Sequence, residues 1–273
     1  MSSSSVETLT DREYWEGYWE KGIHEVPEEI ALIDNKYADA LYYPFRKFID
    51  SSKPISALEI GGAPGLFVSG LTKMHPNLKP GVLDYTDRGV NETKAVSEKF
   101  GINIAIHKKD MFVDDLSDLP PYDVVYSLGV VEHYEDLELS FDKHLECAGP
   151  GGIVIFGLPV FLGINDWLAG RLAPDNRDTW YTAIMEKESW KKFYERKDIE
   201  VLFDDYVGGF NPHVHHRFVT EKTVFNRAIY VGLHALFAKV WDKIPGTDRL
   251  NSKRFSFYYY FVVRKLPAIE TAS

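Results

Sequence analysis

Residues 55–160 alternate short apolar runs with helix-like segments, which is the pattern of an α/β protein. Strands are predicted at 57–60, 81–85, 104–111 and 122–129, and residues 150–156 turn into a fifth. Because helices separate these strands, we expect a parallel sheet with helices on both faces. A strand at 200–207, a helix at 221–243 and a last strand at 255–264 would complete a seven-stranded, doubly wound, mostly parallel sheet.

The chain on either side of this alternation has a different character. Residues 9–52 read as helices, capped first by Thr10 and Asp11, with aromatic residues at helical spacing that include Tyr14, Trp15, Tyr18 and Trp19. Residues 28–48 are expected to form the second of these helices. We therefore assign residues 1–52 to an N-terminal helical cap and residues 53–273 to the main domain.

Residues 161–190 mix glycine, proline and aromatic residues with little regular period. A loop of that length in a compact domain is usually functional, so we expect a lid or substrate-binding insertion. Helix resumes at 186–195. In the 221–243 helix the apolar stripe consists of Val224, Ala228, Gly232, Leu236 and Val240. Tyr258, Tyr259 and Tyr260 alternate faces of the last strand and are expected to pack in the core.

Chemistry-bearing residues begin where the first strand breaks into glycines, at Glu59-Ile60-Gly61-Gly62-Ala63-Pro64-Gly65. Gly61, Gly62 and Gly65 let the backbone turn tightly and approach a ligand. The spacing does not match the dinucleotide pattern G-x-G-x-x-G, because Ala63 and Leu66 stand where glycines would be needed. Glu59 suits a cationic ligand better than a pyrophosphate.

Acidic residues also end the next two strands. Asp84 lies 19 residues after Gly65, where a carboxylate that binds ribose hydroxyls is expected, and Tyr85 could lie against an adenine ring. The third strand ends at Asp110-Met111. The fourth runs through Tyr126-Ser127-Leu128-Gly129 into Glu132-His133, and Pro150-Gly151-Gly152 turns into the fifth.

In this order and spacing the motifs resemble those of class I S-adenosylmethionine-dependent methyltransferases of the small-molecule type. The resemblance is close over residues 55–160, with Ala63 in place of the middle glycine of the E/D-x-G-x-G-x-G motif. It implies a Rossmann-like methyltransferase fold and S-adenosyl-L-methionine as the cofactor. The residues expected to bind this cofactor are Glu59, Gly61, Gly62, Gly65, Asp84, Tyr85, Asp110, Met111, Ser127 and Leu128.

The expected reaction is methyl transfer to a small-molecule acceptor, with a hydroxyl oxygen of a natural product or sugar favoured over an amine. His133 follows the fourth strand at its carboxyl end and titrates near neutral pH, so it is the candidate catalytic base. The Glu-His pair could instead brace the loop or touch the cofactor. Glu132, Tyr14 and Trp19 are assigned to the acceptor side.

A second histidine group, His213, His215 and His216, follows the strand at 200–207. We expect these side chains to contact the acceptor. Two imidazoles and a carboxylate could also hold a divalent metal, although we predict no metal site. A polar loop that only borders the pocket is the remaining interpretation.

The composition of the chain restricts which binding partners and which location are expected. The 273 residues carry a net charge of −10, which disfavours a nucleic-acid partner. One cysteine, no span-length apolar run and no signal-like features in residues 1–5 favour a cytoplasmic protein without a membrane partner. Oligomerisation is left open. The alternatives are an RNA 2′-O-methyltransferase, which the missing Asp after the fourth strand disfavours, and a non-catalytic S-adenosylmethionine-binding protein.

Overall fold

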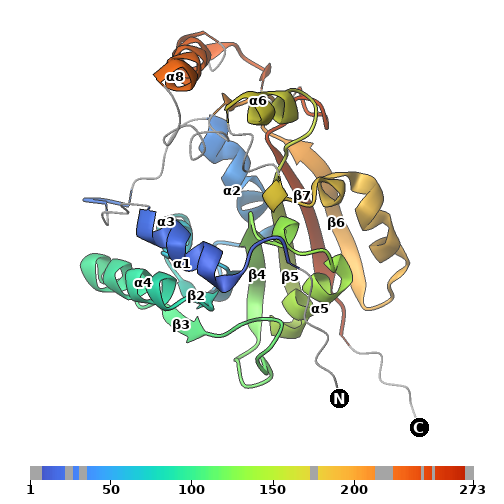
Figure 1. The fold of residues 1–273 in the computed structure, drawn as a ribbon. Coiled ribbons are helices and arrows are strands. Elements are labelled where there is room, and N and C mark those ends of the chain that lie inside the picture. Colours follow the sequence, from blue (N-terminus) through green and yellow to red (C-terminus); the bar gives the residue numbers. More distant parts are fainter. Residues whose placement is uncertain are drawn as a thin grey trace.

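The computed structural model describes most of the chain. The described residues are 8–21, 27–30, 36–172, 178–212, 224–240, 243–247 and 250–267. They form one seven-stranded sheet with helices on both faces (Figure 1). The strands are β1 Ile55–Ile60, β2 Leu78–Asp84, β3 Ala105–Lys108, β4 Tyr122–Leu128, β5 Ala148–Pro159, β6 Ile199–Val207 and β7 Tyr258–Lys265.

The sheet order is β3-β2-β1-β4-β5-β7-β6. Strands β1 to β5 pair in parallel, whereas β7 runs antiparallel to both β5 and β6. The predicted mostly parallel, seven-stranded Rossmann-like sheet is confirmed. The chain leaves β1 towards β2 and β3 and returns on the other side of β1 with β4. At such a switch point the carboxyl ends of neighbouring strands leave a crevice in which open α/β sheets bind ligands.

Helices connect the strands of the parallel part. They are α3 Leu66–Met74, α4 Asp87–Phe100 and α5 Leu137–Cys147. The 3₁₀ turn η1, Val131–His133, follows β4. After β5 come α6 Ile164–Leu172 and the 3₁₀ segments η3 Thr182–Met185 and η4 Lys187–Glu195, so residues 161–190 contain more regular structure than their composition suggested. The expected helix at 186–195 is a 3₁₀ helix.

Alternating side chains of the central strands fill two cores, one on each face of the sheet. Phe156 of β5 and Tyr259 of β7 pack with Phe141 of α5 and Trp190 of η4 on one face. Tyr126 of β4 and Tyr260 of β7 pack on the other face. Tyr258, Tyr259 and Tyr260 are all at most 6% exposed, so the expectation that they pack in the core is confirmed.

The two N-terminal helices have different positions. Helix α2, Lys36–Phe48, begins later than the sequence suggested, and its Tyr42 and Phe45 belong to the second core. It is therefore part of the main packing. Helix α1, Arg12–Lys21, lies across the sheet's edge near α4 (Figure 1). Of the residues assigned to an N-terminal cap, Tyr14 and Trp15 of α1 line the crevice, and so do Ile30 and residues of α2 such as Tyr37.

The long helix before β7 is α8, Val224–Lys239. Its apolar stripe does not face the protein: Ala228, Gly232, Leu236 and the following Val240 are exposed. Tyr230 and Leu233, which lie on another face of the helix, pack against Leu168 and Leu172 of α6 instead. Among the described helices, none combines the length and the apolar character that crossing a bilayer requires.

Candidate functional site

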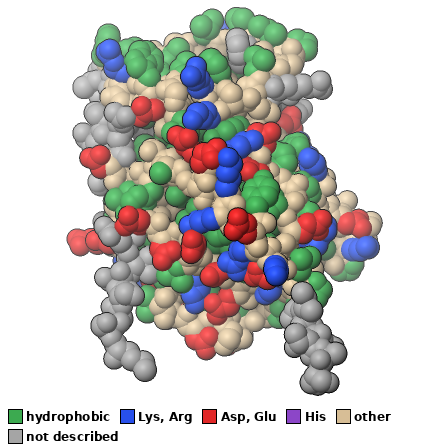
Figure 2. Space-filling view, turned by 90° about the vertical axis from the view of Figure 1, so that its right-hand side faces the viewer, with side chains coloured by type: hydrophobic (Ala, Val, Ile, Leu, Met, Phe, Trp, Pro, Cys, Tyr) green, Lys and Arg blue, Asp and Glu red, His purple; other side chains and the backbone are tan. Residues whose placement is uncertain are grey.

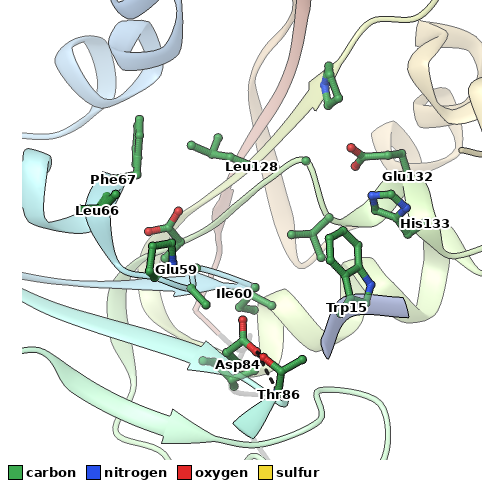
Figure 3. Close-up of a pocket in the computed structure, with 18 of the residues that line it drawn as sticks. Trp15, Glu59, Ile60, Leu66, Phe67, Asp84, Thr86, Leu128, Glu132 and His133 are labelled. Atoms are coloured by element: carbon green, nitrogen blue, oxygen red, sulfur yellow. Dashed lines mark hydrogen bonds between the residues drawn. The ribbon is translucent and has the colours of Figure 1, made fainter. Parts of the chain in front are cut away.

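A cavity of about 660 Å³ occupies the crevice at the carboxyl ends of β1, β2 and β4 (Figure 3). Glu59 and Asp84 stand on neighbouring strand ends, and Trp15, Glu132 and His133 lie on the opposite side. The cavity wall is mostly aromatic and aliphatic, with a few polar groups. Such a mixture is typical of a site for a small organic ligand.

The loop between β1 and α3 forms the floor of the cavity. Gly61 has φ of +66°, and a Cβ there would lie 2.7 Å from Cγ2 of Val130. A Cβ on Gly62 would lie 2.5 Å from Cγ of Glu59. Both positions therefore require glycine, which leaves the backbone of this loop bare towards the cavity.

Glu59 lies under this loop and is 6% exposed. One carboxylate oxygen, Oε2, accepts hydrogen bonds from the Tyr126 hydroxyl at 3.1 Å and from the Val68 backbone N–H at 3.2 Å. Burial nevertheless raises the Glu59 pKa to about 8. A positively charged ligand group beside it would favour the ionised form, so the site is suited to a cation.

Asp84 ends β2 and is also buried. Its Oδ1 accepts hydrogen bonds from the Thr86 N–H at 2.9 Å and hydroxyl at 2.7 Å, and the Ala63 N–H also bonds to the carboxylate. Burial is the main cause of its raised pKa. These bonds fix the carboxylate at the cavity wall, where it lines the space between β2 and the glycine loop.

The remaining predicted cofactor residues divide into two groups. Tyr85, Asp110, Met111 and Leu128 line the cavity together with the residues above. Gly65 does not: with φ of +80° it is the N-cap residue that precedes α3. Ser127 does not line it either, because its hydroxyl lies 2.9 Å from Nε2 of the buried His144. Ser127 faces the core because alternate residues of β4 point to opposite faces.

Helix α1 closes the cavity on the β2 side. Nη1 of Arg12 donates a hydrogen bond to the Tyr85 carbonyl at 2.8 Å, and the guanidinium carbon lies 4.9 Å from the Tyr85 ring centre. The Glu16 carboxylate accepts from the Asp87 N–H at 2.8 Å, at the start of α4. Glu16 therefore ties α1 to an N-terminus where negative charge is favourable.

His133 lies at the end of η1 and is 5% exposed. Its Nδ1 is 2.8 Å from the Thr179 carbonyl oxygen, which can only accept, so Nδ1 carries the proton and Nε2 has the free lone pair. Burial lowers the His133 pKa to about 4, and the imidazole is neutral at physiological pH. The Trp15 indole meets it edge to face, with 5.0 Å between ring centres.

Glu132 precedes it and is 1% exposed. Within the described part of the chain its Oε2 has no hydrogen-bond partner, although the residue lines the cavity. Burial raises its pKa to about 8. An unpaired buried carboxyl oxygen is unfavourable unless a ligand donates to it, so Glu132 marks where a polar hydrogen of a ligand would lie.

Aromatic residues from distant parts of the chain form the wall next to Glu132. Phe161 and Trp180 stack with ring centres 4.0 Å apart, and Tyr258 lies opposite Pro159 at the start of β7. All four line the cavity. The sequence indicates only core packing for Tyr258, because its position at the carboxyl edge of the sheet depends on the antiparallel direction of β7. Trp180 could have been found from the aromatic content of residues 161–190.

Of the other residues predicted to contact the acceptor, only some belong to the part of the chain that the structure describes. Tyr14 lines the cavity and is 39% exposed. The Trp19 side chain lies outside the described residues, as do His213, His215 and His216. Among the residues that the structure describes, no group of three or more His, Cys, Asp or Glu side chains is arranged so that it could hold a metal ion.

Comparison with known proteins gives a family and a set of similar folds. A family model described as "Methyltransferase domain" matches residues 32–212, roughly two thirds of the chain. No curated protein sequence matches the chain. Among solved structures, coclaurine N-methyltransferase bound to N-methylheliamine and SAH has a TM-score of 0.53 at 12% identity, over 84% of this chain and 72% of that one.

Two further structures are similar. The O-methyltransferase segment StiE O-MT has a TM-score of 0.52 at 15% identity, over 84% of this chain and 74% of that one. The plantazolicin methyltransferase BpumL, in complex with a pentazolic desmethylPZN analog and SAH, has a TM-score of 0.53 at 14% identity, over 94% and 92%. At these identities the likeness concerns the fold.

Proposed function

Because the chain belongs to the methyltransferase-domain family, we propose that it transfers a methyl group from S-adenosyl-L-methionine to a small-molecule acceptor held in the cavity. The observation that carries this proposal is one cavity that is lined by the glycine loop, by two buried carboxyl groups and, on its opposite side, by the His133 imidazole. The acceptor we favour is a hydroxyl oxygen.

The residues present fit this methyl donor. A Cβ at Gly61 or Gly62 would collide with Val130 or Glu59, so the loop carries no side chain there and its backbone can approach the donor closely. Asp84 offers carboxylate oxygens to ribose hydroxyls, Tyr85 and Met111 offer apolar surface to an adenine, and Glu59 lies buried under the loop to balance positive charge. When bound, S-adenosylmethionine supplies an activated methyl group on a cationic sulfur.

The chain's own contribution to chemistry would be positioning, water exclusion and proton removal. A hydroxyl acceptor must lose its proton as its oxygen is methylated. Nε2 of His133 carries a free lone pair, and the bond from Nδ1 to Thr179 keeps it in that tautomer. His133 takes the acceptor's proton and becomes an imidazolium, while Trp15 and α1 exclude water from its surroundings.

Glu132 would orient the acceptor by receiving a hydrogen bond from it. This residue also favours a second candidate, transfer to an amine nitrogen, because a buried carboxylate with a free oxygen is a suitable partner for an ammonium group. In that case a cationic amine would bind with release of the proton that Glu132 holds below its pKa of about 8, and the ammonium group would then pass a proton to His133 to free the lone pair that attacks the methyl group. Hydroxyl and amine acceptors therefore differ in proton balance on binding.

The cover over this site is proposed to consist of α1 with its preceding turn and of the 161–190 insertion. The Leu9 N–H donates to the His133 carbonyl at 3.0 Å, and the Tyr181 N–H donates to the Glu132 carbonyl at 2.8 Å. Each segment therefore contacts the Glu132–His133 pair, in which Glu132 is proposed to orient the acceptor and His133 to remove its proton. His213, His215 and His216 are proposed to extend this acceptor side.

Calorimetry with S-adenosylhomocysteine tests the donor assignment first, because the product must bind if the donor does. Methyl transfer is then measured with isotope-labelled S-adenosylmethionine and a panel of hydroxyl and amine compounds. With the product bound, 2-phenylethanol and 2-phenylethylamine serve as matched probes of the acceptor type. Tighter binding of the amine, lost in Glu132→Gln, would favour N-methylation, and absence of S-adenosylhomocysteine binding would refute the methyltransferase proposal.

A further inference from the structure

The outward face of α8 is apolar although it lies in solvent. Phe225 is 73% exposed, Leu236 is 61% exposed and Ile229 is 40% exposed. These residues are spaced so that they share one side of the helix. Single exposed apolar side chains are normal on a protein surface, but a continuous row of them along a helix indicates an interaction site.

This row is not the face that holds α8 to the protein. Tyr230 and Leu233 already pack against Leu168 and Leu172 of α6, and Phe210 meets Phe237 with ring centres 6.0 Å apart. The helix is therefore attached by one apolar side and presents a second one outwards. A helix that only needed to pack on its own domain would carry polar residues there.

Segments next to α8 also expose apolar side chains. Trp167 on α6 is 60% exposed, and Val240 and Ile244, which follow α8, are also exposed. We define the α8 surface as Trp167, Phe225, Ile229, Leu236, Val240 and Ile244. Figure 2 shows hydrophobic side chains gathered along the top of the molecule, where Figure 1 places α6 and α8, with the acidic side chains visible on that face lying lower.

The charge around the α8 surface differs from that of the whole chain. Residues 224–254 include six Lys or Arg and two Asp, a net charge of +4, whereas the chain as a whole carries −10. Lys239, Lys243 and Arg254 are among the exposed described residues. Arg171 lies beside the Trp167 ring, 5.8 Å from guanidinium carbon to ring centre. Apolar side chains with basic neighbours match a lipid surface that carries negative charge.

The α8 surface also lies next to the proposed acceptor site. Tyr37 lines the cavity and lies near enough to Tyr230, on the inner side of α8, to add to the rise in the Tyr230 pKa that burial causes. Nζ of Lys36 donates a hydrogen bond to the Ile244 carbonyl at 2.7 Å. Any partner bound at the α8 surface would therefore also lie close to the wall of the cavity.

We propose that the α8 surface docks onto an anionic phospholipid bilayer, with α8 lying in the plane of the headgroups. A 16-residue helix is about 24 Å long, which suits a helix that lies on a membrane rather than across it. Its apolar row enters the acyl boundary while the lysines and arginines meet the phosphates. The expectation of no membrane partner rests on the lack of a span-length apolar run, which does not bear on a helix that lies on the membrane surface.

Vesicle sedimentation tests this proposal with the full chain. We expect the protein to bind vesicles made of equal parts phosphatidylcholine and phosphatidylglycerol, less so at high salt, and to bind pure phosphatidylcholine weakly. The double variant Phe225→Gln/Leu236→Gln should lower partitioning by roughly tenfold or more, because each change removes apolar burial in the bilayer. Lys239→Glu/Lys243→Glu should weaken binding to the anionic vesicles specifically.

Matched controls use the same substitutions elsewhere. Val113→Gln changes an apolar residue that is 80% exposed away from α8, and Lys191→Glu changes an exposed lysine of η4; neither should alter partitioning. Unchanged thermal unfolding shows that each variant folds. No binding to anionic vesicles, or binding that the α8 variants leave intact, overturns the proposal. Self-association in solution that the double variant abolishes, without vesicle binding, identifies a second copy as the occupant and also overturns it.

Discussion

Nδ1 of His133 and the carbonyl oxygen of Thr179 lie 2.8 Å apart, although 46 residues separate them in the sequence. A carbonyl accepts only, so this contact assigns the imidazole proton to Nδ1 and the lone pair to Nε2. An insertion after the fifth strand thereby determines the tautomer of a histidine that follows the fourth strand.

Replacing His133 by alanine tests its role as the base. We expect His133→Ala to lower turnover by roughly 10²–10⁴-fold with little change in S-adenosylhomocysteine affinity. His107→Ala, a histidine that does not line the cavity, should leave turnover unchanged. Because burial lowers the His133 pKa to about 4, the acid limb of the rate should lie near that pH and disappear in His133→Ala. Turnover that survives in His133→Ala would refute the assignment.

Asp84→Ala should weaken S-adenosylhomocysteine binding by about 1.5–3 kcal/mol, the range for hydrogen bonds to charged groups. Gly61→Val should weaken it further, because its Cβ would lie 2.7 Å from Val130 and its φ is +66°. Gly101→Val is the matched control: Gly101 has φ of +62° but open space around it. Calorimetry that gives Asp84→Ala the wild-type affinity would remove Asp84 from the site.

Glu132 should make stability depend on pH in a defined direction. Its pKa is about 8 in the folded protein and near 4.3 when unfolded, so the folded state binds more protons between these values. The stability that Glu132 contributes to the folded state by binding this proton is fully present below about pH 4 and is lost as the pH rises to 8. Glu132→Gln should therefore be more stable than wild type at pH 8 by up to about 4–5 kcal/mol, with little difference at pH 4.

Urea unfolding at the two pH values measures this difference. Glu138→Gln, at an exposed glutamate that does not line the cavity, is the control variant. If Glu132→Gln and wild type differ equally at both pH values, Glu132 is ionised in the folded protein and its carboxylate has a partner.

If α1 and the 161–190 insertion cover the site, hydrogen exchange in residues 8–21 and 178–190 should slow when S-adenosylhomocysteine and an acceptor bind. The N–H groups of Leu9 and Tyr181, which bond to the carbonyls of His133 and Glu132, should respond most. Core amides of β7 serve as the reference because they are buried with or without ligand. Equal protection in both states would show that these segments do not move.

The histidines at 213, 215 and 216 should affect acceptor binding. We expect alanine at His213 or His215 to raise the Michaelis constant for the acceptor more than it lowers turnover. EDTA should leave activity intact. If EDTA abolishes activity while His133→Ala retains it, the histidine loop is a metal site and His133 is not the base.

The sequence was sufficient to predict the strands and the glycine loop, because apolar runs that end in Glu59, Asp84 and Asp110 have strong local signals. It was less informative where a residue's surroundings come from distant segments. Ser127 shares a motif with Leu128 but points into the core, and Trp180 reaches the cavity only through the path of the insertion.

Helix α8 illustrates the same limit differently. Periodicity identified an apolar stripe through Leu236 correctly but could not say which of two apolar faces the protein covers. The packing of Tyr230 on α6 decides this, and that contact joins elements more than 50 residues apart. Hydrophobic periodicity is a property of one helix alone, whereas the face that is buried depends on the element that packs against it.

The hydrogen bonds from Leu9 and Tyr181 to the His133 and Glu132 carbonyls have a consequence for timing. When either segment lifts to admit or release a molecule, the proposed base loses part of what orients it. Proton removal is then disabled in the state that is open to solvent. The protein would thus avoid spending its methyl donor on water, and its selectivity for an acceptor would depend on how well that molecule lets both segments close.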